Sequence, residues 1–317
     1  PTRRSSDLNM GFYDILEKTP NCSYIAGGSV TNTIRVANWM INGNPDLGCY
    51  LIGCIGKDEY GSKVTSELEK VGVEPILEVS ENELTSRCAC GIVGEARCLL
   101  PQIRASSKLS KSFVEKNIEK ILEAEILFIE GYFLIDCWDI VKLLYSSFEM
   151  AQKKIGFTLS AVFMIENFFD KIREVSNASD FIFANEDEAQ AFVKMLGQEP
   201  SNSNVDNSKI IHKSLDKDEN RILIFTHGAL PTTVSTWDYE KDTFKELLEV
   251  PIYPVDKDKI EDTNGCGDTL CGGFMAEYMK GSDLYTCVKA GQYAASIVIQ
   301  HVGCTFPEKP DFVVPKK

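Results

Sequence analysis

The stretch Asp262-Thr263-Asn264-Gly265-Cys266-Gly267-Asp268 joins a polar turn to a helix of small and apolar residues, which we expect to run from Gly267 to about Met279. Glycines on both sides of Cys266 let the backbone turn sharply and approach a ligand closely. The free N–H groups in the first turn of such a helix point at whatever lies in front of them, and the helix dipole favours an anion there. The stretch therefore predicts an anion-binding site at a helix N-terminus.

Asp268, the carboxylate inside this stretch, has two open interpretations. An aspartate in the first turn of a helix is normally a capping residue. A carboxylate that faces a bound phosphate would instead suit phosphoryl transfer, in which it takes a proton from the attacking hydroxyl group.

Cys266 also has two open interpretations. A thiol at a helix N-terminus has a lowered pKa and a raised reactivity, so alkylation of Cys266 would inactivate the protein. Alternatively, the side chain turns away from the ligand and packs against the sheet.

Composition describes a globular protein without a strongly basic surface. The 317 residues are 44% hydrophobic and carry a net charge of −14, which argues against general binding to nucleic acid or anionic membranes. We find no run of about 18 apolar residues that would predict a membrane span, and no signal peptide. The eleven cysteines include no Cys-x-x-Cys pair, which favours a reduced protein of the cytoplasm. Three scattered histidines give a zinc site little support.

Predicted helices and strands alternate from about residue 110 onward. Expected helices are 111–124, 137–151, 161–174 and 186–197, and expected strands are 126–130, 155–159 and 180–184. This rhythm predicts parallel β-α-β units in a covered sheet. The polar segment 199–220 is expected to be a loop with one weak helix. Strands follow at 221–226, 232–237 and 243–250, the last two as a hairpin, and a final helix at 283–301.

The first third of the chain is less regular. We expect helices at 11–18, 30–42 and 60–71, a buried strand at 47–55, and short strands between 84 and 100 that form an edge sheet. The segment 56–63 resembles a phosphate-binding Walker loop, but Ser62-Lys63 stands where that loop needs lysine followed by serine or threonine. We interpret it as a strand-to-helix turn. No Gly-x-Gly-x-x-Gly supports a dinucleotide site.

Two further sites have both a structural and a functional interpretation. The segment Asn185-Glu186-Asp187-Glu188 follows an apolar strand, which places it at the carboxyl edge of the sheet where α/β proteins bind ligands. It is equally well explained as the acidic first turn of a helix. Arg97 lies in a turn of the edge sheet, where an arginine is usually only solvated.

Further short motifs occur along most of the chain, in addition to the stretch described first. They are Ala26-Gly27-Gly28-Ser29 with Asn32, Val36–Met40, Gly53–Asp58, Gly131–Leu134, Asn185–Ala189, Tyr293–Ser296 and Gly303–Pro310. In this order they resemble the ribokinase-like (PfkB) carbohydrate kinases, and among them the branch that phosphorylates adenosine.

The resemblance implies a ribokinase-like α/β fold, with a central, mostly parallel sheet covered by helices. A small α/β lid, discontinuous in sequence, would comprise roughly residues 11–41 and 75–104. The implied reaction transfers a phosphoryl group from ATP to the 5′-hydroxyl of adenosine, giving AMP for purine salvage. Asp268 would take the hydroxyl proton, and the amides of Gly265, Cys266 and Gly267 would stabilise the developing charge. Arg97 would reach the phosphate when the lid closes.

The resemblance also implies which residues bind the two substrates and the metal. Adenosine would contact Gly27, Gly28, Ser29, Asn32 and Phe133, whose ring would stack on adenine. ATP would contact Asn185, Thr226, Gly228, Asn264 and Gln292, although relatives often carry histidine at the last position. Mg²⁺ would be held through water by Asn185 and Glu188, because it prefers to keep its waters. We expect a monomer that acts in the cytoplasm and also in the nucleus.

Two alternatives stay open. One is another nucleoside or sugar kinase of the same fold, which the run Gly303–Pro310 argues against. The other is a nucleoside-binding relative that is inactive in this truncated form. Residues 1–8 do not match the family and are expected to be an artefact of sequence assembly. Relatives begin with a strand whose aspartate binds the ribose, and this sequence lacks it, so we expect the chain as written to be a poor kinase.

Overall fold

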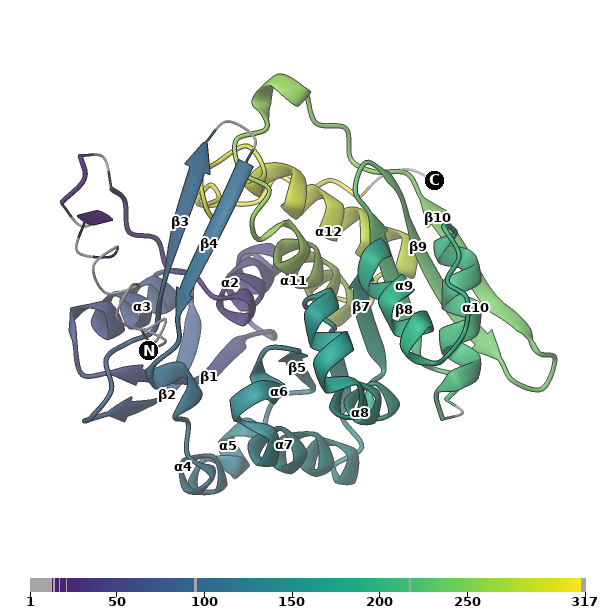
Figure 1. Ribbon diagram of the computed structural model, residues 1–317, viewed down its shortest axis with the longest axis horizontal. Helices are drawn as coiled ribbons and strands as arrows, with labels where there is room; N and C mark the ends of the chain where they lie inside the picture. Colours follow the sequence, from purple (N-terminus) through teal and green to yellow (C-terminus); the bar gives the residue numbers. More distant parts are fainter. Residues whose placement is uncertain are drawn as a thin grey trace, which may run out of the picture.

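The computed structural model describes residues 13, 15–16, 18–20, 22–93, 96–216 and 218–314. The strands at the centre of the molecule are β5 (Ile126–Glu130), β6 (Lys154–Thr158), β7 (Phe181–Asn185), β8 (Ile222–His227), β9 (Leu230–Asp238) and β10 (Thr243–Val250). Within the described residues they form one six-stranded sheet with the order β10-β9-β8-β7-β6-β5 (Figure 1). Strands β5 to β8 are parallel, whereas β9 and β10 form the predicted antiparallel hairpin. The parallel strands therefore all end at one carboxyl edge.

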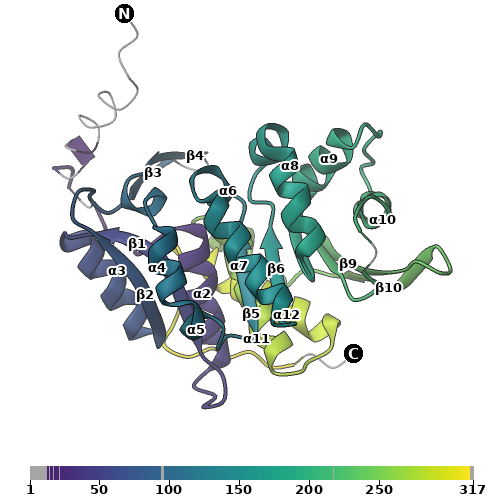
Figure 2. The ribbon, with the colours of Figure 1, turned by 90° about the horizontal axis from the view of Figure 1, so that it is seen from below.

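Helices cover both faces of this sheet (Figures 1 and 2). One face carries α7 (Trp138–Met150), α8 (Val162–Ala178), α9 (Glu186–Met195) and α10 (Asn204–Ser214). The other face carries α11 (Cys266–Met279) and α12 (Leu284–Val298), and α2 (Ser29–Ile41) packs beside α11. The result is a three-layer arrangement whose two hydrophobic cores lie above and below the sheet.

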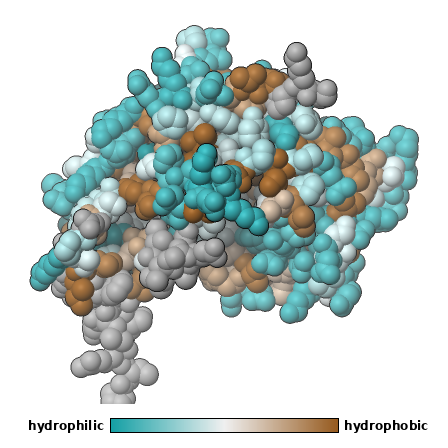
Figure 3. Space-filling model, turned by 90° about the horizontal axis from the view of Figure 1, so that it is seen from above, coloured by the Kyte–Doolittle hydropathy of each residue, from teal (hydrophilic) through white to brown (hydrophobic). Residues whose placement is uncertain are grey.

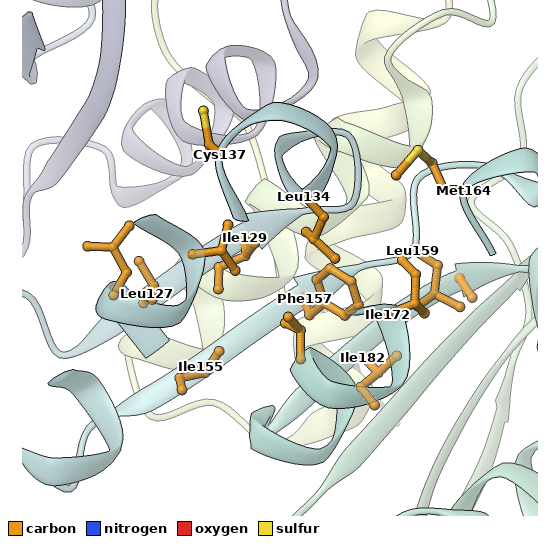
Figure 4. Close-up of a cluster of buried hydrophobic side chains, with 14 of the residues drawn as sticks. Leu127, Ile129, Leu134, Cys137, Ile155, Phe157, Leu159, Met164, Ile172 and Ile182 are labelled. Carbon is orange, nitrogen blue, oxygen red and sulfur yellow. The ribbon is translucent and has the colours of Figure 1, made fainter. Parts of the chain in front are cut away.

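Both faces of the central strands are buried, because successive side chains of a strand point to opposite sides. In β7, Ile182 and Ala184 belong to the core under α7, α8 and α9, whereas Phe181 and Phe183 belong to the core under α11 and α12. Figure 4 shows part of the first core, including Leu127, Ile129, Ile155, Phe157, Ile172 and Ile182. Strands of this kind are continuous apolar runs in the sequence, and β5 to β7 were predicted to within one residue at each end.

Smaller elements extend the molecule on the side of β5. Strands β1 (Cys49–Gly56) and β2 (Val73–Ser80) pair in parallel, with α3 (Glu59–Lys70) between them in sequence. Strands β3 (Arg87–Val93) and β4 (Ala96–Gln102) form an antiparallel hairpin that stands apart from the central sheet (Figure 1). The helical turns are α4 (Lys111–Lys116), α5 (Ile118–Ile121), α6 (Phe133–Asp136), η1 (Ala105–Ser107) and η2 (Lys257–Lys259).

The structure differs from the predicted elements in a few places. The helix expected at 111–124 breaks into α4 and α5 at Asn117, whose side chain donates to the Phe113 carbonyl at 2.8 Å. Strand β2 was not predicted, because Pro75 and its glutamates hide the apolar pattern. Helix α10 is a full helix with Ser203 as its N-cap. The helix expected at 11–18 falls largely outside the described residues, as do residues 1–8.

Helix α2, which the sequence reading assigned to the lid, packs in the main body of the protein. Its residues Val36, Trp39 and Met40 share a core with Ala290 and Tyr293 of α12. The division into a large domain and a lid therefore stays a prediction, with β3 and β4 as the part that stands free of the sheet.

Among the described residues, no helix is both long and apolar enough to cross a bilayer. Seen from above, the molecule shows hydrophilic residues with hydrophobic patches scattered among them (Figure 3).

Three glycines bring the backbones of α2, α11 and α12 into contact. A methyl group on Gly272 of α11 would lie 2.4 Å from the Thr33 carbonyl oxygen of α2, and one on Gly273 would lie 2.7 Å from the Ala290 carbonyl oxygen of α12. On α12, a methyl group on Gly291 would lie 2.5 Å from the Leu270 carbonyl oxygen. Because backbone atoms cannot move aside as a side chain can, only glycine fits these positions.

We expect Gly272→Ala to lower the free energy of unfolding by about 1–3 kcal/mol, the usual cost of overpacking. The higher helix propensity of alanine, worth about 1 kcal/mol at most, would offset only part of this loss. Urea unfolding followed by circular dichroism measures the difference. Gly48→Ala is the control, because nothing lies within 4 Å of the added methyl group. Equal stability of the two variants would contradict the close packing described above.

Candidate active site

Two helix N-termini meet at one place beside the sheet. Gly265 is the N-cap of α11 and has a φ of 77°, and Gly28 is the N-cap of α2 and has a φ of 105°. Both values lie in the region that glycine adopts readily and other residues rarely do. Among the described residues, no side chain caps either helix. The Cys266 amide donates to the Thr263 carbonyl at 3.4 Å. Other first-turn amides, and the positive ends of both dipoles, are available to an anion.

Asp268 lies in the first turn of α11, and its side chain contacts α2 rather than the backbone of its own helix. One carboxylate oxygen accepts a hydrogen bond from Ser29 Oγ at 2.8 Å, and the other accepts one from Asn32 Nδ2 at 2.9 Å. The interpretation of Asp268 as a cap is therefore wrong for this structure. Burial raises the pKa of Asp268 to about 6, although the bonds from Asn32 and Ser29 oppose the rise. A group with this pKa is mostly ionised at neutral pH and can accept a proton.

Two buried charged residues hold the surrounding loops in place. Asp262 is 1% exposed and accepts hydrogen bonds from the Asn264 amide at 2.9 Å and the Gly303 amide at 3.0 Å. Arg35 of α2 donates to the carbonyl oxygens of Ala26 at 3.4 Å and Cys304 at 3.2 Å. Together they connect the loop before α2, the loop before α11 and the loop after α12.

Glu130 is a residue of this site that the sequence analysis missed. It is the last residue of β5, and its carboxyl group faces the Ser29 hydroxyl and the Val30 amide of α2. Burial and the nearby Asp268 raise the pKa of Glu130 to about 7. Within the described residues, its Oε2 atom is buried without a hydrogen-bond partner. A polar residue that ends an apolar strand was the available signal, since the same signal drew attention to Asn185.

Two exposed aromatic rings lie side by side near the same edge. The rings of Tyr132 and Phe163 are 5.9 Å apart with an interplanar angle of 31°, and they remain 40% and 48% exposed. The Tyr132 hydroxyl donates to the Ser160 carbonyl at 3.1 Å, which fixes its ring. By contrast Phe133, the aromatic residue expected to contact a ligand, packs against the hydrophobic core. The sequence does not show which of the adjacent rings, Tyr132 or Phe133, faces a ligand, because the direction of each ring depends on the backbone at the start of α6.

The ends of β7 and β8 bring Asn185 and Thr226 together, since the two residues pair in register. Asn185 and Glu188 form a capping box at the start of α9: the two Glu188 oxygens accept from the Asn185 amide and side chain, both at 3.0 Å. Burial raises the pKa of Glu188 to about 7. Gly228 forms the turn between β8 and β9 with a φ of 51°. The capping interpretation of this segment is thus confirmed, and a role of these oxygens toward a metal stays a prediction.

Gln292 does not lie with Asn185 and Thr226 at the ends of β7 and β8. It is 5% exposed, and its amide donates to Thr232 Oγ1 and to the Val250 carbonyl, both at 3.1 Å. Its role in the structure is to tie α12 to β9 and β10.

The hairpin of β3 and β4 contacts the glycine loop before α11. Asn264 Nδ2 donates to Cys90 Sγ of β3 at 3.5 Å. Arg97 lies in β4 opposite Ile92, and its side chain is outside the described part of the structure. The hairpin therefore approaches the site, while a contact from Arg97 stays a prediction.

The interpretation of Cys266 as an activated thiol is wrong. Burial raises its pKa to about 12, and the negative charges of Asp262 and Asp268 act in the same direction. These effects outweigh the helix dipole on which the sequence argument relied. Cys266 is partly buried and remains a thiol at neutral pH.

Comparison with known proteins gives consistent results. A model of the pfkB family of carbohydrate kinases matches residues 3–311. Adenosine kinase 2 of Arabidopsis thaliana is 34% identical over 97% of this chain and 88% of its own length. The adenosine kinase of Saccharomyces cerevisiae is 31% identical over 96% of this chain and 87% of its own.

Solved structures agree with these sequence matches. Anopheles gambiae adenosine kinase superposes with a TM-score of 0.86 at 27% identity, covering 96% of this chain and 89% of that one. Schistosoma mansoni adenosine kinase in complex with 2-fluoroadenosine gives 0.83 at 25% identity, covering 94% and 86%. The ribokinase-like fold expected from the sequence is confirmed. Matched along almost its whole length, the chain belongs to the pfkB family of carbohydrate kinases, which transfer a phosphoryl group to an alcohol.

Proposed function

We propose that this protein transfers the γ-phosphoryl group of ATP to the 5′-hydroxyl of adenosine. The observation that carries the proposal is the position of Asp268, a carboxylate held by Ser29 and Asn32 between two uncapped helix N-termini. A base next to an anion site is what phosphoryl transfer to a hydroxyl requires. The similarity to curated adenosine kinases supports adenosine as the acceptor.

Asp268 acts as the general base in this proposal. The bonds from Ser29 and Asn32 fix both carboxylate oxygens, so the group keeps one orientation while its remaining lone pairs face the acceptor hydroxyl. The amides of Gly265, Cys266 and Gly267 stabilise the charge on the transferring phosphoryl group, as preorganised dipoles do without further rearrangement. Arg97 would add a positive charge from the β3–β4 hairpin.

The acceptor nucleoside would lie between α2 and the aromatic pair. Gly27, Gly28, Ser29 and Asn32 form the polar side, where the backbone of the loop is open to a ribose. The rings of Tyr132 and Phe163 form the apolar side and offer the exposed surface on which a base stacks. This assigns the stacking role to Tyr132 and Phe163 in place of Phe133.

The donor nucleotide would lie across the ends of β7 and β8. Asn185 and Thr226 pair at this edge, and Gly228 turns the chain from β8 into β9. Asn264, in the loop before α11, would also contact the nucleotide, whereas the buried Gln292 ties α12 to β9 and β10. Within the described residues, no group of three or more His, Cys, Asp or Glu side chains could bind a metal directly. The oxygens of Asn185 and Glu188 suit a hydrated Mg²⁺ instead, because their capping bonds still leave lone pairs for water. When bound there, Mg²⁺ would neutralise phosphate charge.

Phosphorylation of a panel of acceptors tests the proposal directly. With labelled ATP and Mg²⁺, we expect adenosine to give the highest kcat/KM among purine nucleosides, pyrimidine nucleosides, ribose and fructose. A sugar preferred over every nucleoside would overturn the proposed acceptor and leave the family assignment intact.

We expect Asp268→Asn to lower kcat by at least about 10²-fold, the usual scale for loss of a general base. Adenosine affinity, measured by calorimetry, should change little because the amide can still contact Asn32 and Ser29. The matched control is Asp283→Asn, since Asp283 caps α12 by accepting from the Thr286 amide at 2.9 Å and asparagine caps equally well. Normal turnover of Asp268→Asn would show that Asp268 is not the base.

We expect Tyr132→Ala and Phe163→Ala each to raise KM for adenosine by roughly one to two orders of magnitude, the range that stacking energies imply. KM for ATP should stay near its normal value, because the pair lies on the acceptor side. Phe133→Ala is the comparison: it should lower stability through the core without a selective change in the KM for adenosine. The reverse pattern would restore Phe133 as the stacking residue.

A further inference from the structure

The β3–β4 hairpin pairs with no other strand among the described residues, so contacts outside a larger sheet must hold it in place (Figure 1). It nevertheless reaches the site, because Asn264 Nδ2 donates to Cys90 Sγ at 3.5 Å. Arg97, which we expect to act on the phosphoryl group, belongs to the same hairpin. A small rotation at the root of the hairpin, by which we mean residues 84–86 and 103–106, would displace both Cys90 and Arg97.

Asp58 connects this root to the body of the protein. It is the N-cap of α3, where its Oδ1 atom accepts from the Gly61 amide at 2.8 Å. The same carboxylate also accepts two hydrogen bonds from Thr85, one from the hydroxyl at 2.7 Å and one from the amide at 2.8 Å. Thr85 Oγ1 in turn accepts from the Gly56 amide at the end of β1 at 3.0 Å. Helix capping accounts for the bond from Gly61 but not for the bonds that involve Thr85.

The backbones at this Asp58–Thr85 joint are in direct contact. A methyl group on Gly56 would lie 2.5 Å from the Thr85 amide nitrogen, and one on Gly61 would lie 2.4 Å from the Gly56 carbonyl oxygen. Burial disfavours the ionised form of Asp58, but hydrogen bonds that include those from Thr85 and Gly61 outweigh it and lower the pKa of this carboxyl. Asp58 is therefore ionised at neutral pH and can accept all of these bonds.

The two chain segments of the root are also tied to each other. Ser86 Oγ accepts from the Arg104 amide at 2.9 Å and from the Ser106 amide at 3.2 Å. Because Ser86 follows Thr85 directly, a contact that fixes Thr85 fixes both segments.

Two tyrosines contact the hairpin beyond its root. Tyr13 Oη accepts from the Ala89 amide at 3.1 Å, and Arg87 donates to Tyr60 Oη at 3.3 Å. Asp58 differs from them because it holds the chain segment about which the hairpin would rotate.

We propose that Asp58 is a positioning residue for phosphoryl transfer: through Thr85 it fixes the β3–β4 hairpin over the glycine loop that precedes α11. Hydrogen bonds to a charged acceptor are stronger than neutral ones, so a carboxylate with at least three donors holds the root in one orientation. The inference rests on the proposed function in one respect, namely that Arg97 of the hairpin acts on the transferring phosphoryl group.

Asp58→Asn tests this role, because asparagine caps a helix as well as aspartate does. Whichever way its amide turns, an NH2 group meets one of the donors that the carboxylate satisfied. We expect kcat to fall at least about tenfold while KM for ATP stays within about twofold, since a misplacement of about 1 Å can cost as much as 10²-fold in rate. Asp283→Asn is the matched control, because Asp283 caps α12 through the Thr286 amide.

Variants of Thr85 and Arg97 show whether Asp58 acts through the hairpin. Thr85→Val removes the hydroxyl with little change of shape and should lower kcat as Asp58→Asn does, whereas Thr85→Ser keeps the hydroxyl and should retain normal kcat. In an Arg97→Ala background, Asp58→Asn should cost little more, because the residue that the hairpin positions is gone. Losses that multiply in the double variant would overturn the proposal.

Methyl NMR without substrate tests the joint independently of catalysis. The methyl groups of Leu99 and Leu100 in β4 report on the hairpin, and those of Leu223 in β8 report on the central sheet. In Asp58→Asn and Thr85→Val we expect lower order parameters or microsecond-to-millisecond exchange at Leu99 and Leu100, with Leu223 unchanged. Asp283→Asn should match the wild type at all three residues.

The outcomes separate the joint from the proposed function. Hairpin methyl dynamics equal to those of the wild type in both Asp58→Asn and Thr85→Val would overturn the joint, whatever the activity. A more mobile hairpin with unchanged kcat would overturn the positioning role. A wild-type protein that phosphorylates no nucleoside would overturn the proposed function, and the NMR comparison would still test the joint.

Discussion

The contact between the backbones of α2, α11 and α12 is the constraint on which the rest of the site depends. Gly272 and Gly273 of α11 let this helix approach both neighbours so closely that no side chain fits between the backbones. The helix is thereby fixed along and around its axis. Its first turn then meets the first turn of α2, and Asp268 reaches Ser29 and Asn32. If flexible side chains held α11 instead, the helix could shift. The Asp268 carboxylate would then lie 2.8 Å from the Ser29 hydroxyl only part of the time.

The electrostatics of the site follow from the same packing. Asp268, Glu130 and Glu188 all have raised pKa values, and burial is the first cause in each case. The chain as a whole carries a net charge of −14, yet the family's donor, ATP, is strongly anionic. Uncapped helix ends reconcile these facts, because they attract phosphate with dipoles and need few cations. The raised pKa values of the buried Glu130 and Glu188 carboxyls also favour their neutral forms, which limits the negative charge that phosphate meets.

Sequence reasoning found the parts of this structure that local pattern determines. The covered strands, the hairpin of β9 and β10 and the turn into α11 were predicted because apolar runs and glycines encode them directly. Glu130 and the pair of Tyr132 and Phe163 were missed, since their roles depend on which way side chains at strand ends point. The pKa of Cys266 was predicted in the wrong direction, because the helix dipole is visible in a sequence and the burial that outweighs it is not.

The site joins residues from opposite ends of the chain, which determines when it can form during synthesis. Ser29 and Asp268 are 239 positions apart, and Arg35 contacts the carbonyl of Cys304 near the end of the chain. Contacts of such long range form late and slow the folding of a protein. Until α11 and α12 leave the ribosome, the apolar side of α2, with Val36, Trp39 and Met40, has no partner from these helices. In the newly made chain this apolar side of α2 is therefore open to aggregation and to a molecular chaperone until synthesis is nearly finished.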